Sequence, residues 1–302
     1  MTRQPPRPAH VHPAATRGEN LRGAALSVGA ALGFTLVSIM VKQLGLLGID
    51  AFQTVFVRTF VGMAVIVPMM WHAGVAPWRT DHIRIHASRA VLGGFAVLFG
   101  YYAFTKLPLA EVTAISFTVP LFVTVLAVFL LREEVRWRRW TATAVGFAGV
   151  LVVARPFHGE PQLATLLALG MSLCVGLSVV LLKTFPKKES QLLMLFYFLV
   201  SSGLMAAGPA VLGWQTPSRD GWLLLLGVGL VATGSQALIV RAFRVGDASF
   251  VAPFDYVRLL FAGAAGVVMF AEIPDAWTSA GSALIIGSTL YIARREALAK
   301  RR

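Results

Sequence analysis

The residues best placed to do chemistry are Asp255 and Arg258, an acid and a base three positions apart inside a long apolar stretch. Residues at this spacing share one face of a helix, so we expect the two side chains to lie together. Each charge in the interior of a bilayer costs about 2.5–3.5 kcal/mol. The two side chains are therefore not expected to face lipid as separate, unpaired charges. The pair is either a ligand site, in which Arg258 meets an anion and Asp255 meets an amine or carries a proton, or an ion pair that only fixes helix packing.

Several other polar and aromatic side chains fall inside apolar stretches and are candidates for contact with a substrate. Arg58 lies seven residues into the second stretch, where it either pairs with a polar group across the bundle or lines a vestibule. Tyr101 and Tyr102 either belong to an aromatic belt at a helix end or stack on an aromatic or cationic ligand. Most hydroxyl and amide side chains are expected to bond to their own helix or a neighbour, which leaves one or two of them for contact with substrate. The remaining candidates are Tyr256, Ser116, Gln236 and Ser38.

Two prolines and the histidines complete the list of unusual residues. Pro120 and Pro253 each remove a backbone hydrogen bond from an apolar stretch, so both are expected to bend a helix and are candidate hinges. His82 and His86 have a metal-like spacing, but no cysteine accompanies them and we predict no metal. All six histidines lie in tails, loops or the ends of stretches, which gives no support to catalysis by a Ser/His/Asp triad. We therefore expect neither an enzyme nor a cofactor.

Composition identifies the environment of these residues. The 302-residue chain is 57% hydrophobic and 14% charged, with a mean hydropathy of +0.72, which is typical of a membrane protein. A membrane-spanning helix needs about 20 apolar residues. We predict an all-α integral membrane fold of ten such helices, at 23–43, 51–71, 87–105, 109–131, 137–155, 162–182, 190–212, 221–240, 248–270 and 276–293.

The net charge of +13 is explained by the distribution of basic residues. With ten spans, 21 of the 27 lysines and arginines fall in the tails and in the loops on one side. The other side holds only Lys42, Lys106, Arg155 and Arg219. This is the positive-inside pattern, so both termini are predicted to be cytoplasmic and no nucleic-acid partner is needed. We expect a disordered cytoplasmic tail at 1–21, without a signal peptide, and a basic tail at 295–302.

Residues 103–140 and 242–277 look like two copies of one segment. Each begins with Ala-Phe and ends near a Trp-Thr pair, and the spacing from Ala110 to Glu134 equals that from Ala248 to Glu272. A duplication with five helices in each half requires inverted repeats, which we place at 22–156 and 157–294. In this register the first copy has Phe117 and Pro120 where the second has Asp255 and Arg258. The two halves are therefore chemically unequal at this position.

These motifs resemble the EamA family of the drug/metabolite transporter superfamily. The resemblance includes the run from Ala103 to Pro108, Leu131-Arg132-Glu133-Glu134, Ala242-Phe243-Arg244, and Pro253-Phe254-Asp255-Tyr256. It extends over roughly residues 22–295 and implies a multi-pass protein of the bacterial inner membrane. It also implies alternating access to a cavity between the halves, with a small molecule and membrane lipid as partners.

The charges of Asp255 and Arg258 match the amino and carboxyl groups of an amino acid, so we predict an amino-acid exporter. The alternatives are uptake of a cofactor-like metabolite, such as riboflavin or S-adenosylmethionine, and an intramembrane lipid-modifying enzyme. The amino-acid sequence leaves open three points: the direction of transport, proton coupling through Asp255, and whether the protein is a monomer or a dimer.

Overall fold

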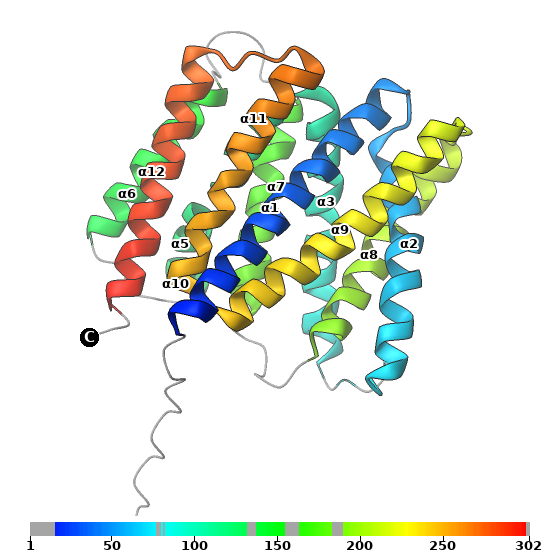
Figure 1. Ribbon diagram of the computed structural model, residues 1–302, viewed down its shortest axis with the longest axis horizontal. Helices are drawn as coiled ribbons and strands as arrows, with labels where there is room; N and C mark the ends of the chain where they lie inside the picture. Colours follow the sequence, from blue (N-terminus) through cyan, green and yellow to red (C-terminus); the bar gives the residue numbers. More distant parts are fainter. Residues whose placement is uncertain are drawn as a thin grey trace, which may run out of the picture.

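The computed structural model describes residues 16–76, 80, 82–131, 137–154, 163–182 and 190–299, and within these ranges it is helical without a strand. Figure 1 shows the helices packed side by side. Glu134 and the Arg132–Arg136 part of the predicted basic cluster lie outside the described residues. The elements are α1 (Arg17–Leu46), α2 (Ala51–His72), α3 (Ile83–Lys106), α4 (Leu109–Ser116), α5 (Val119–Leu131), α6 (Trp137–Ala154), α7 (Leu163–Leu182), α8 (Gln191–Leu212), α9 (Arg219–Val245), α10 (Ala248–Val251), the 3₁₀ helix η1 (Ala252–Tyr256), α11 (Val257–Phe270) and α12 (Ala276–Ala299).

Local capping sets where the first helix begins. The Thr16 hydroxyl accepts from the Glu19 amide at 3.3 Å, and the Glu19 carboxylate accepts from the Thr16 amide at 2.8 Å. This capping box satisfies amides that a helix start leaves without partners. Residues 17–21 are therefore helical and do not belong to the disordered tail that we expected. At the other end α12 continues to Ala299, past the predicted boundary at 295, through residues with high helix propensity.

The fourth and ninth predicted helices are both interrupted in their first half. The fourth is divided between α4 and α5 at Phe117 and Thr118, and the ninth passes through η1 before α11. In the register of the duplicated segment, Val119 at the start of α5 pairs with Val257 at the start of α11. The two halves therefore interrupt their helices at matching positions.

Prolines lie at these interruptions, but they do not kink continuous helices as we expected. Pro120 is in the first turn of α5, where a missing amide hydrogen costs little, and Pro253 lies near the start of η1. The break before α5 is held by the Thr118 hydroxyl and amide, which both donate to the Ile115 carbonyl at 2.7 and 2.9 Å.

Replacing Pro120 with alanine should therefore change stability only slightly. The expected effect is a loss of about 0.4–1 kcal/mol in the free energy of unfolding, because the unfolded chain gains entropy when proline is removed. A Val125→Pro control in the middle of α5 should cost about 3 kcal/mol, because it removes an intrahelical hydrogen bond. Melting of both purified variants in detergent, followed by tryptophan fluorescence, tests this. A loss for Pro120→Ala as large as that of Val125→Pro would contradict this account of the break.

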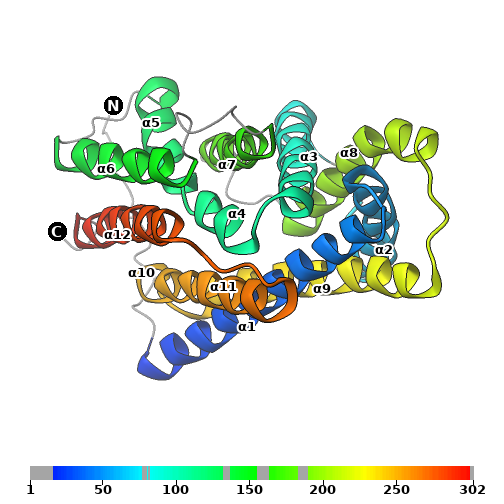
Figure 2. The ribbon, with the colours of Figure 1, turned by 90° about the horizontal axis from the view of Figure 1, so that it is seen from above.

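The contacts between helices can be compared between the two predicted halves of the chain. Seen from above, α2 and α8 pack together at one end and α6 and α12 at the other, with α1 against α9 and α3 against α7 between them (Figure 2). If each of the first five predicted segments is matched in order with one of the last five, α1 corresponds to α7 and α3 to α9. The observed contact of α1 with α9 then corresponds to the observed contact of α7 with α3. In the same way, the α3–α8 contact corresponds to α9–α2, and the α5–α7 contact to α11–α1. These helix contacts therefore have counterparts when the two predicted halves are exchanged.

Eight helical segments of the described chain are long and apolar enough to cross a membrane, and a shorter apolar helix covers Trp140–Val153. The eight are α1, α2, α3, α4 with α5, α7, α8, α9, and η1 with α11. Large apolar side chains on these segments are exposed, including Trp71, Leu204, Leu212 and Val268. Such a surface suits contact with lipid.

Candidate functional site

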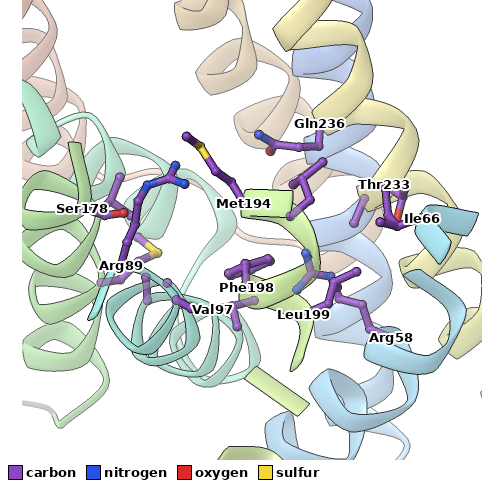
Figure 3. Close-up of a pocket in the computed structure, with 18 of the residues that line it drawn as sticks. Arg58, Ile66, Arg89, Val97, Ser178, Met194, Phe198, Leu199, Thr233 and Gln236 are labelled. Carbon is purple, nitrogen blue, oxygen red and sulfur yellow. The ribbon is translucent and has the colours of Figure 1, made fainter. Parts of the chain in front are cut away.

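A cavity of about 780 Å³ lies among α2, α3, α7, α8 and α9. Its size is in the usual range for sites that bind small organic molecules. Apolar side chains form much of the wall, and Figure 3 shows Phe198, Val97 and Leu199 among them. No side chain that lines it in the described part of the chain is a carboxylate. The polar lining residues are Arg58, His86, Arg89, Tyr101, Ser178, Gln191, Thr233 and Gln236.

Arg58 projects from α2 into this cavity between two aromatic rings. The guanidinium carbon lies 5.6 Å from the centre of the Tyr101 ring and 5.5 Å from that of Phe198. Attraction to the two ring faces orients the cation without neutralising it. Its Nη1 atom is buried and has no hydrogen-bond partner among the described residues.

A second basic group lines the cavity from the first turns of α3. In the view of Figure 3, Arg89 and Arg58 lie on opposite sides of Phe198. His86 is 2% exposed and stacks on Tyr197, with 5.3 Å between ring centres. The cavity is therefore basic at two places, which favours a ligand with an anionic group.

Asp255 and Arg258 are brought together, as their spacing predicts, but they do not line this cavity. Arg258 Nη2 lies 4.0 Å from Asp255 Oδ2 and donates to the Ser116 hydroxyl at 2.9 Å. The guanidinium also lies over Phe117, 5.0 Å from the ring centre. Tyr256 packs its ring on Phe117 at 4.7 Å. Arg258 thus joins α11 to the end of α4, at the two helix breaks.

A largely buried ion pair joins three parts of the chain at the end of α1. Lys42 pairs with Glu272, and the Lys42 ammonium donates to the Leu107 carbonyl at 2.7 Å. The Glu272 carboxylate also accepts from the Leu109 amide at 2.9 Å. Ala271, just after α11, has a left-handed backbone with φ 54°, which turns the chain so that Glu272 reaches this position. The contacts fasten α1, the α3–α4 junction and the end of α11 together.

The structure divides the predicted site residues into three groups. Arg58, Tyr101 and Gln236 line the cavity. Asp255, Arg258, Ser116 and Tyr256 form the separate cluster at the helix breaks. Ser38 donates to the Thr35 carbonyl of its own helix at 2.8 Å, and Tyr102 packs against the buried apolar core.

Sequence reasoning missed Arg89, His86, Gln191 and Thr233 as residues of the cavity. We predicted that the third helix would begin at 87 and treated the preceding residues as a loop. The helix begins at Ile83, so His86 and Arg89 lie one turn apart on it. Their spacing of three residues was the available signal, since it predicts a shared face once the helix is extended.

Comparison with known proteins identifies the family. The model of the EamA-like transporter family matches residues 21–155 and again residues 162–294. An S-adenosylmethionine uptake transporter of Rickettsia prowazekii is 32% identical over 84% of this chain and 86% of its own length. A riboflavin transporter of Vibrio cholerae is 29% identical over 93% of this chain and 96% of its own.

Two further proteins, an exporter and a protein of known structure, are also similar to this chain. The pseudopaline exporter CntI of Pseudomonas aeruginosa is 26% identical over 90% of this chain and 96% of its own. A solved crystal structure shares the fold with a TM-score of 0.59 at 18% identity, over 92% of this chain and 98% of that one. The resemblance inferred from the motifs is confirmed: the chain belongs to the EamA-like transporter family and is a multi-pass protein of the bacterial inner membrane.

Proposed function

We propose that this transporter carries a cofactor-like metabolite that combines an anionic group with an aromatic ring system, with S-adenosylmethionine as the first candidate. The observation that carries this proposal is the cavity, which has two arginines, several aromatic rings and no carboxylate among its described lining residues. Arginines suit a carboxylate, and Tyr101, Phe104 and Phe198 suit a ring or a sulfonium cation. Its volume of about 780 Å³ is generous for a simple amino acid.

The names of the relatives support a ring-bearing metabolite, and of the two compounds named, S-adenosylmethionine also has the anionic group. The R. prowazekii relative is an S-adenosylmethionine uptake transporter, and the V. cholerae relative is a riboflavin transporter. Both names refer to metabolites larger than an amino acid that contain a nitrogenous ring system. We therefore prefer this class to the amino-acid export expected from the sequence.

For the architecture we propose ten membrane-spanning segments in two inverted five-helix repeats, residues 22–156 and 157–294, with both termini in the cytoplasm. Three observations support it: the uneven distribution of basic residues, the two separate family matches, and helix contacts that have counterparts when the two halves are exchanged. In this orientation His86, Arg89 and Gln191 lie toward the cytoplasm, and the Lys42–Glu272 pair lies at the outer end. The conformation would then be closed on the outside, as one state of an alternating-access cycle.

Transport in proteoliposomes tests the substrate. We expect saturable uptake of radiolabelled S-adenosylmethionine by vesicles that contain the protein, and competition by excess unlabelled compound. Competition by riboflavin would widen the class to other ring-bearing cofactors. Uptake no faster than in protein-free vesicles, together with saturable uptake of an amino acid, would replace this proposal by amino-acid transport.

Amino-acid export remains the second candidate because an acid and a base lie together at the helix breaks. Asp255 and Arg258 are 23–30% exposed, and Arg258 is satisfied in part by Ser116. If this cluster binds a zwitterion, Asp255→Asn and Arg258→Ala should each reduce amino-acid transport by about tenfold or more, from the loss of a charge-assisted hydrogen bond. Wild-type rates in both variants would leave the cluster with a structural role only.

A further inference from the structure

We infer that Arg58 and Tyr101 form a subsite that binds a carboxylate group of the transported molecule. The inference rests on the proposed function, and it assigns one group of the substrate to two side chains. The remainder of the substrate would then lie along the aromatic wall of the same cavity.

Two unsatisfied donors on one wall carry this inference. Arg58 Nη1 and the Tyr101 hydroxyl oxygen are both buried, and neither has a hydrogen-bond partner among the described residues. Tyr101 is only 6% exposed, so its hydroxyl lacks ready access to bulk water. Buried polar atoms in folded proteins almost always have partners. Both residues line the cavity, so we expect an acceptor bound there to meet both donors.

The surroundings of Arg58 select a carboxylate. Its guanidinium is oriented by the rings of Tyr101 and Phe198, which contact it without accepting conventional hydrogen bonds. An oriented guanidinium binds a planar carboxylate through two parallel hydrogen bonds. No carboxylate among the described lining residues competes for it. The missing acceptor is therefore expected to arrive with the ligand.

Arg89 differs from Arg58 in one respect that decides between them. Its Nε atom also has no partner among the described residues, whereas Arg58 and Tyr101 combine unpartnered donors with a contact between the two side chains. Arg58 and Tyr101 provide two unpartnered donors from α2 and α3, and the Arg58 guanidinium carbon lies 5.6 Å from the centre of the Tyr101 ring. The specific subsite is therefore assigned to that pair.

The first test compares S-adenosylmethionine with its decarboxylated form, which lacks only the carboxylate. Binding is measured as ligand-induced stabilisation of the purified full-length protein in detergent. For wild type, the decarboxylated compound should require about a tenfold or higher concentration for equal stabilisation, since a buried polar site rejects a ligand that leaves it unpaired. Arg58→Gln should reduce this ratio to near one, and Tyr101→Phe should reduce it in part. The matched control, Arg219→Gln, replaces an exposed arginine outside the cavity lining and should keep the wild-type ratio.

A second test is independent of S-adenosylmethionine. Acetate alone should stabilise wild type and Arg219→Gln but not Arg58→Gln. Stabilisation by inorganic phosphate in place of acetate would overturn the carboxylate assignment, and an Arg58→Gln response equal to that of wild type would overturn the subsite.

The two tests also separate the two proposals. If S-adenosylmethionine is neither bound nor transported while acetate behaves as expected, the proposed substrate is wrong and the subsite stands. If S-adenosylmethionine is transported and Arg58→Gln keeps the wild-type ratio, the subsite is wrong and the proposed function stands.

Discussion

Replacing Glu272 with alanine is expected to lower the free energy of unfolding by about 3–5 kcal/mol, the usual effect of removing one partner from a buried ion pair. Lys42 and Glu272 have side chains that are only 10% and 18% exposed. Without Glu272, the Lys42 ammonium keeps the Leu107 carbonyl as its neutral acceptor, and the Leu109 amide at the start of α4 loses its carboxylate. The melting temperature of the purified protein in detergent measures the loss.

Two variants control this experiment. Asp220→Ala removes an exposed acid at the start of α9 and should change the melting temperature little. Replacing both Lys42 and Glu272 with methionine should recover more than half of the loss, because no unpaired charge then remains buried. A Glu272→Ala protein as stable as Asp220→Ala would show that the pair contributes nothing to holding the three segments together.

Filling the cavity is expected to have the largest effect on transport. Thr233 lines the cavity, and its hydroxyl donates to the Gly229 carbonyl of its own helix at 2.8 Å, so the hydrogen bond lost on its replacement lies within α9. In Thr233→Trp the indole would occupy space that the substrate needs. Overpacking costs about 1–3 kcal/mol of stability in a protein core, and a clash with substrate of the same size would lower transport at low substrate concentration about tenfold to a hundredfold.

The matched control lies on the same helix. Leu230 is 57% exposed and is not among the lining residues, so Leu230→Trp should transport at the wild-type rate. Comparison of initial uptake rates in proteoliposomes with equal amounts of inserted protein decides the matter. Equal rates for Thr233→Trp and Leu230→Trp would show that the substrate does not pass through this cavity.

The amino-acid sequence alone was sufficient for the all-helical membrane class and for the family. Hydrophobic stretches, the asymmetry of basic residues and the duplicated segment are local patterns, and each can be recognised without knowing which helices touch. The pairing of Asp255 with Arg258 was also predictable, because residues three apart meet on one helical face. The helix breaks were signalled by Pro120 and Pro253, although the structure places these prolines at helix starts and not at kinks.

Only the tertiary structure decided which of the candidate residues share a cavity. Asp255 and Arg258 had the strongest signal in the sequence, yet they join helix breaks outside the cavity that Arg58 and Tyr101 line. Lys42 and Glu272 are 230 positions apart, and no local pattern could pair them. Hydropathy and helical periodicity report which residues are buried and which neighbours share a face. Contacts between distant helices depend on how the whole bundle packs, which is why the sequence predicted the kind of protein and the structure located its candidate site.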